Sequence, residues 1–73
     1  MNNVTYESAL VIGMGLIGSS IARVLKEKKI SKKIFALDKN NDVISITKNL
    51  QLVDEIESDL YKYKQQFDVI FIC

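Results

Sequence analysis

The chain has 73 residues, of which 48% are hydrophobic, and its formal net charge is +1. This length allows one small domain, because a domain of this size buries only about 60% of its unfolded surface. The near-neutral charge argues against a nucleic-acid partner, which requires a clearly basic domain with clustered lysines and arginines.

The first predicted elements are a strand and an amphipathic helix. Ala9–Ile12 is a continuous apolar run that ends at Gly13, as is typical of a strand buried on both faces of a parallel sheet. A helix is predicted to follow and to run to about Lys29. Its apolar stripe consists of Ile17, Ile21, Val24 and Leu25. The lysines near its end suit the negative end of the helix dipole.

A second strand and a second helix come next. The apolar run Ile34–Leu37 ends abruptly at Asp38, which predicts a strand. Either Asn40 or Asn41 is the expected N-cap of the following helix, and Asp42 is placed favourably near the positive end of its dipole. The residues predicted to share one face of this helix are Val43, Ile46, Thr47 and Leu50.

The last third of the chain has a weaker pattern. Gln51–Glu57 shows no clear period, so no regular element is predicted there. Ser58 is the expected N-cap of a third helix. The apolar positions of that helix are Leu60, Tyr63 and Phe67. The apolar run Val69–Cys73 predicts a third strand in which Cys73 is buried.

Alternating strands and helices predict an α/β fold, namely the βαβαβ half of a doubly wound parallel sheet (Rossmann-like) with strand order 3-2-1. A final parallel strand with no covering connection leaves apolar surface and a sheet edge unprotected. We therefore expect residues 1–73 to be a partial domain that self-associates or packs against a further C-terminal domain.

All three glycines of the chain lie in one motif between the first strand and the first helix, Gly13-Met14-Gly15-Leu16-Ile17-Gly18. Gly13 permits the tight turn, Gly15 leaves space for a pyrophosphate, and Gly18 allows close packing of helix and strand. The amides of Leu16 and Ile17 lie in the first helical turn, where free N–H groups favour phosphate oxygens. The motif predicts dinucleotide binding, although three glycines can also form a purely structural turn.

The acidic residue Asp38 strengthens this prediction. It closes the second strand about 20 residues after the motif, where a carboxylate accepts hydrogen bonds from the adenosine ribose. The same charge repels a 2′-phosphate, which favours NAD over NADP, and the neighbouring Lys39 offsets part of that repulsion. The predicted cofactor-binding residues are Gly13, Met14, Gly15, Leu16, Ile17, Gly18, Asp38 and Lys39.

Other chemistries lack the residues that they need. The chain has no histidine, so it offers no His-based acid, base or metal ligand. The glycine loop does not end in the Gly-Lys-Ser/Thr of a P-loop. Ser19 and Ser20 have no visible base and are expected to form local helical hydrogen bonds. We predict no catalytic residue and no metal site within residues 1–73.

The cellular setting is expected to be the cytoplasm. A single cysteine, Cys73, allows no internal disulfide, and Met1–Ser8 lacks the charged and apolar regions of a signal peptide. The apolar stretch Ala9–Leu25 is shorter than the roughly 20 residues of a membrane span and carries Arg23. We therefore expect no membrane partner.

The glycine motif together with Ser19-Ser20 resembles the start of prephenate and arogenate dehydrogenases. Three further stretches share the resemblance: Ala36–Asn40, Leu52–Ile56 and Asp68–Cys73. The resemblance implies NAD-dependent oxidative decarboxylation of prephenate or arogenate in tyrosine biosynthesis, and it carries over only the cofactor residues Gly13, Gly15, Gly18 and Asp38. The catalytic histidine and the substrate-binding arginine of that family come from later segments, so only a longer parent protein would bind the small-molecule substrate.

The sequence departs from the family at two positions, because Ser19 and Gln51 stand where glycine is common. Gln51 implies that the second helix ends without a left-handed cap. Two other functions stay open: a noncatalytic nucleotide-binding or self-associating module, and an NAD-linked dehydrogenase of a neighbouring family that acts on another small acid.

Overall fold

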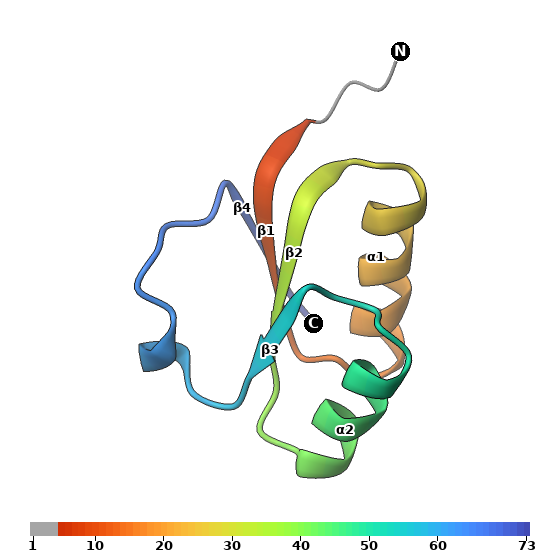
Figure 1. The fold of residues 1–73 in the computed structure, drawn as a ribbon, viewed down its shortest axis with the longest axis vertical. Coiled ribbons are helices and arrows are strands. Elements are labelled where there is room, and N and C mark those ends of the chain that lie inside the picture. The colour runs from red at the N-terminus through yellow and green to blue at the C-terminus, as the bar shows by residue number, and fades with distance from the viewer. Residues whose placement is uncertain (1–4) are drawn as a thin grey trace.

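The computed structural model describes residues 5–73, so the prediction for Met1–Ser8 falls partly on residues outside the described range. Residues 5–73 form a four-stranded sheet with both α-helices on one face (Figure 1). The elements are β1 (Tyr6–Ile12), α1 (Leu16–Glu27), β2 (Ser31–Leu37), α2 (Asn41–Asn49), β3 (Glu55–Glu57), the 3₁₀ turn η1 (Leu60–Lys62) and β4 (Val69–Ile72).

The sheet is parallel throughout, with the order β3-β2-β1-β4, which confirms the predicted α/β, Rossmann-like fold. The order 3-2-1 holds for its first three positions. The strand in the third position is Glu55–Glu57, however, where the sequence predicted no regular element. The apolar run near the end of the chain forms β4 instead, on the other side of β1. Cys73 follows this strand and is exposed, so its predicted burial was wrong.

The predicted apolar stripe of α1 is partly correct, because Leu25 is buried and Ile21 packs against the core. Gly18, Ala22 and Leu25 are the buried residues of α1, whereas Ile17 and Val24 are exposed. The small residues Gly18 and Ala22 also lie on the inward face and let the helix approach the sheet closely. The predicted face of α2 was also partly wrong. Its packed residues are Val43, Ile44 and Thr47, whereas Ile46 and Leu50 are exposed.

Both helices end in a residue with a left-handed backbone. Gln51 has a φ of 52° and Lys29 a φ of 54°. After α2, the Gln51 N–H donates to the Lys48 carbonyl at 3.1 Å, and the Leu52 N–H donates to the Thr47 carbonyl at 3.3 Å. This is the Schellman arrangement, which satisfies carbonyls at the helix end. The prediction that α2 lacks a left-handed cap was therefore wrong.

The second face of the sheet is covered by the connection from β3 to β4 (Figure 1). Within the described residues 58–68, the only regular element is η1, so the predicted third helix was wrong. Asp59 rather than Ser58 provides the cap, because its carboxylate accepts a hydrogen bond from the Tyr61 N–H at 3.0 Å.

An aromatic cluster holds this connection on the sheet. The ring of Tyr63 makes edge contacts with Phe35 and Phe67, at centroid separations of 5.7 and 5.5 Å. Its hydroxyl donates a hydrogen bond to the Ala36 carbonyl at 2.9 Å. Burial raises the pKa of the Tyr63 phenol above its usual value, and the nearby carboxylates of Glu55 and Glu57 raise it further.

Two aspartates fix where the outer strands begin. Asp54 precedes β3, and its carboxylate accepts the Ile34 N–H of β2 at 2.7 Å. Asp68 precedes β4, and its carboxylate accepts the N–H groups of Glu7 and Ser8 in β1 at 2.8 and 3.3 Å. Each carboxylate satisfies backbone donors of a central strand just before the ladder starts, so the two outer strands begin in the same way.

Candidate functional site

The glycine loop lies at the carboxyl ends of the strands, where ligands bind in open α/β sheets. Gly13 leaves β1 with a φ of 92°, a conformation that side chains rarely adopt. Its N–H donates to the Leu37 carbonyl at 2.8 Å, and a Cβ there would lie 3.1 Å from the Cys73 carbonyl oxygen. Gly13 is therefore required by the turn itself, at the point between β1 and β4 where the strand order reverses.

The other two glycines differ sharply in their surroundings. A Cβ added to Gly18 would lie 1.8 Å from the Gly13 carbonyl oxygen, so packing of α1 against the loop requires glycine there. A Cβ added to Gly15 would meet no atom of the described residues within 4 Å. Its φ of −70° also needs no glycine. The folded chain thus explains Gly13 and Gly18 but leaves open space above Gly15.

The amino end of α1 keeps its backbone donors free. Among residues 5–73, no side chain caps this end, and the first turn of the helix holds no acidic residue. The contrast is α2, whose N-cap Asn40 accepts the N–H groups of Asp42 and Val43 at 2.8 and 3.2 Å. The N–H groups of Leu16 and Ile17 therefore lie at an uncapped positive helix end, which favours an anion.

The serines that follow form only local hydrogen bonds, as predicted. The Ser19 hydroxyl donates to the Met14 carbonyl at 3.1 Å, and the Ser20 hydroxyl donates to the Leu16 carbonyl at 3.0 Å. Ser19 thereby ties the start of the helix to the loop.

Asp38 is half-buried at the end of β2 and holds two backbone segments together. Its Oδ2 accepts the Met14 N–H at 2.7 Å, and its Oδ1 accepts the Asn40 N–H at 2.9 Å. A carboxylate has about four lone-pair positions, so both oxygens keep capacity for a further donor. The sequence predicted a carboxylate open to ligand hydroxyls, and the structure adds a bond from that carboxylate to the glycine loop.

A cavity of about 450 Å³ lies at the carboxyl edge, between Gly13, the end of β2 and the connection after β3. It contains three of the predicted site residues, Gly13, Asp38 and Lys39. Its remaining lining residues are Ile12, Leu37, Ser58, Asp59, Leu60 and Tyr61. The last four come from the connection after β3 and were missed by sequence reasoning, because their position depends on how that connection crosses the sheet. Met14 is buried and does not line this cavity.

The side chains of Leu16 and Ile17 lie elsewhere. They are 87% and 68% exposed and border an apolar groove of about 690 Å³ along α1. Tyr6 and Phe71 also line this groove. Only the backbone of Leu16 and Ile17 therefore belongs to the candidate site.

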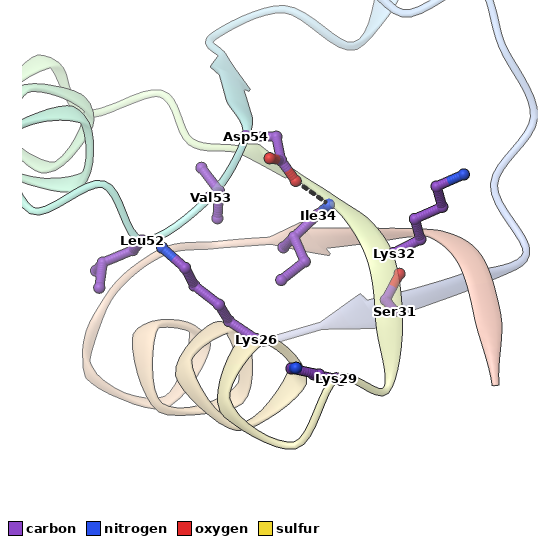
Figure 2. Close-up of a pocket in the computed structure, with 8 residues that line it drawn as sticks. All are labelled: Lys26, Lys29, Ser31, Lys32, Ile34, Leu52, Val53 and Asp54. Carbon is purple, nitrogen blue, oxygen red and sulfur yellow. Dashed lines mark hydrogen bonds between the residues drawn. The ribbon is translucent and has the colours of Figure 1, made fainter. Parts of the chain in front are cut away.

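A further cavity of about 310 Å³ lies at the opposite edge of the sheet (Figure 2). Its lysines include Lys26, whose Nζ donates to the Gln51 carbonyl at 2.8 Å. The carboxylate of Asp54 in its wall is used by the Ile34 N–H. These polar groups join α1 and β2 to the connection before β3, which is a structural role.

The described part of the chain contains neither a cluster of metal-ligating side chains nor a membrane-spanning helix. No group of three or more His, Cys, Asp or Glu side chains within residues 5–73 is placed to hold a metal ion. None of the helices in this range is long and apolar enough to span a bilayer.

Comparison with known proteins finds similarity among solved structures. No protein-family model and no curated protein matches the chain. Among solved structures, it is similar to prephenate dehydrogenase from A. aeolicus in complex with hydroxyphenyl propionate and NAD⁺. The TM-score is 0.82 at 27% sequence identity, and the match covers 90% of this chain but 23% of that one. The chain therefore has the α/β, Rossmann-like fold of a segment of a dehydrogenase and spans less than a quarter of its length.

Proposed function

We propose that this chain is the NAD-binding portion of a prephenate or arogenate dehydrogenase. The observation that carries the proposal is the open space above Gly15 beside an uncapped helix end, because folding alone does not explain a glycine there. The resemblance in the glycine motif and the structural similarity to an NAD⁺-bound prephenate dehydrogenase both support the family.

Two parts of the cofactor, its pyrophosphate and its adenosine ribose, have a matching group in the chain. The pyrophosphate fits the space at Gly15, with the N–H groups of Leu16 and Ile17 as donors. Asp38 accepts hydrogen bonds from the adenosine ribose hydroxyls. When bound, NAD would supply the hydride acceptor for oxidative decarboxylation, while the residues of this chain bind and orient it.

The charges in the cavity favour NAD over NADP. Two carboxylates, Asp38 and Asp59, line the cavity together with one ammonium group, that of Lys39. A 2′-phosphate at the ribose held by Asp38 would bring about two further negative charges next to that carboxylate. We therefore propose that repulsion outweighs the attraction of Lys39 and that NADP binds more weakly.

The chemical step requires groups beyond these residues. The chain has no histidine to take a proton from the substrate. We propose that the small acid substrate is bound by further segments of a longer parent protein, and that residues 1–73 form one part of its dinucleotide-binding domain. A cytoplasmic location suits the free thiol of Cys73.

Calorimetric titration of the chain with NAD and NADP tests the proposal, with Gly15→Ala as the test variant. The added Cβ meets no atom of the described residues, so Gly15→Ala folds with at most about 1 kcal/mol lost at the N-cap. It is expected to weaken NAD binding at least tenfold, because the methyl group fills the space for the pyrophosphate. Leu50→Ala, at an exposed apolar residue outside the cavity, serves as the control. A folded wild-type chain that does not bind NAD, or equal binding by Gly15→Ala, would contradict the proposal.

A further inference from the structure

The connection after β3 brings a specific apolar surface to the nucleotide cavity. Ser58, Asp59, Leu60 and Tyr61 all line the cavity that also holds Asp38. Two of them are large apolar residues that the fold leaves in solvent, with Leu60 51% and Tyr61 86% exposed. Exposed aromatic side chains beside a small-molecule cavity are more informative than exposed apolar residues scattered over a surface.

Hydrogen bonds within this segment and just after it fix its position. The Asp59 carboxylate accepts the Tyr61 N–H at 3.0 Å, and the Asp59 carbonyl accepts the Lys62 N–H at 3.1 Å. Just after the segment, the Tyr63 hydroxyl donates to the Ala36 carbonyl of β2 at 2.9 Å. The turn is thus attached to the sheet two residues after Tyr61, and the fold itself leaves the side chains of Leu60 and Tyr61 exposed.

The chemistry of the cofactor requires such a surface near Asp38. The adenine base is bonded directly to the ribose that we assign to this carboxylate, so the base must lie within the same cavity. Adenine has two flat apolar faces, and flat aromatic or branched aliphatic side chains pack against them. Among the lining residues of the cavity, Leu60 and Tyr61 are the apolar ones most exposed to solvent, and hence the ones able to meet a ligand.

We propose that the η1 turn forms the adenine-binding wall of the site, with Tyr61 and Leu60 as the apolar surface against which the base packs. Tyr61 then determines affinity for the adenosine half of the cofactor, whereas Gly15 and α1 determine affinity for the pyrophosphate. This inference rests on the proposed function, because the position of the base follows from the ribose assigned to Asp38.

The test titrates wild type, Tyr61→Ala and Tyr61→Phe with NAD and with ADP-ribose by calorimetry. We expect Tyr61→Ala to bind both ligands about tenfold more weakly, because a stacked base loses its aromatic partner. Tyr61→Phe keeps the ring and is expected to bind like wild type. Leu50→Ala removes another exposed apolar side chain, one outside the cavity, and is the matched control.

A nuclear magnetic resonance titration gives a second readout. If Tyr61 had only a structural role, added ligand would not shift the signals of its ring. ADP-ribose is expected to shift the ring signals of Tyr61 and the methyl signals of Leu60, through the ring current of the base. Inorganic pyrophosphate carries no base and is expected to leave these signals in place.

The outcomes separate this inference from the proposed function. If wild type binds ADP-ribose and Tyr61→Ala binds it equally well, the base lies elsewhere and the inference is wrong. If the folded wild-type chain binds neither NAD nor ADP-ribose, the proposed function fails, and the adenine assignment fails with it.

Discussion

The carboxylate of Asp38 accepts a hydrogen bond from the backbone N–H of Met14 at 2.7 Å. This bond links the end of β2 to the middle of the glycine loop, so the residue assigned to the ribose also holds the loop assigned to the pyrophosphate. The two halves of the candidate site are therefore mechanically coupled, and a substitution of Asp38 acts on both of them.

A comparison of two substitutions of Asp38 should separate its role in ribose binding from its role in holding the glycine loop. Asp38→Ala removes a charged acceptor and should weaken NAD binding roughly 10- to 100-fold, the equivalent of about 1.5–3 kcal/mol. Asp38→Asn keeps one acceptor oxygen for the Met14 N–H but loses the charge, so it should destabilise the fold less than Asp38→Ala. Calorimetry with NAD and NADP, together with urea unfolding of each variant, measures both effects. If wild type and Asp38→Ala prefer NAD over NADP by the same factor, Asp38 does not bind the ribose as assigned.

Gly18 should be the least replaceable residue of the loop for stability. In Gly18→Ala the new methyl group would lie 1.8 Å from the Gly13 carbonyl oxygen, so the helix or the loop must move. We expect a loss of about 3 kcal/mol or more, although alanine is a better helix former than glycine. Thermal unfolding followed by circular dichroism checks this, with Ser20→Ala in the same turn as a control expected to change stability by about 0.5 kcal/mol. A Gly18→Ala variant as stable as wild type would contradict the packing role.

The sequence predicted those parts of the fold that depend on local pattern. The apolar runs of β1, β2 and β4 and the cap Asn40 are visible without the structure, as are the glycine motif and Asp38. β3 escaped prediction because it has three residues and only its central one, Ile56, is buried. The available signal was Asp54 directly before β3, since Asp68 precedes β4 in the same way.

Long-range contacts account for the rest of what the sequence did not predict. Tyr63 and Phe67 recur at a helical spacing, but both rings pack with Phe35 on the distant strand β2. This contact competes with helix formation and draws the connection onto the sheet. It also positions Leu60 and Tyr61 at the cavity, so the wall proposed for adenine cannot be inferred from periodicity.

The left-handed cap at Gln51 offers a stabilising substitution. The left-handed conformation costs a residue with a side chain about 1–2 kcal/mol, whereas glycine adopts it without this cost. Gln51→Gly should raise the free energy of unfolding by about 0.5–1 kcal/mol after the greater chain entropy of glycine is deducted. Urea unfolding measures the change, and Gln51→Ala, which keeps a Cβ, should match wild type within about 0.5 kcal/mol. A destabilised Gln51→Gly variant would show that the side chain of Gln51 contributes more than its backbone strain costs.

The pH dependence of stability should report on Tyr63. Burial, with the charges of Glu55 and Glu57, raises the pKa of its phenol above the value of about 10 that tyrosine has in an unfolded chain. The unfolded state therefore loses this proton first as the pH rises, so the contribution of Tyr63 is fully present below about pH 10 and is lost progressively above it.

Tyr63→Phe keeps the ring but removes both the titrating group and the hydrogen bond to the Ala36 carbonyl. We expect it to be less stable than wild type at pH 7, by about 1 kcal/mol for the lost bond. The difference between the two proteins should then shrink as the pH rises above 10, because only wild type loses stability through this phenol. Urea unfolding of both proteins between pH 7 and pH 11 measures the difference directly. A constant difference across that range would mean that the Tyr63 phenol titrates equally in the folded and unfolded chains, and that its hydroxyl is not held against the sheet.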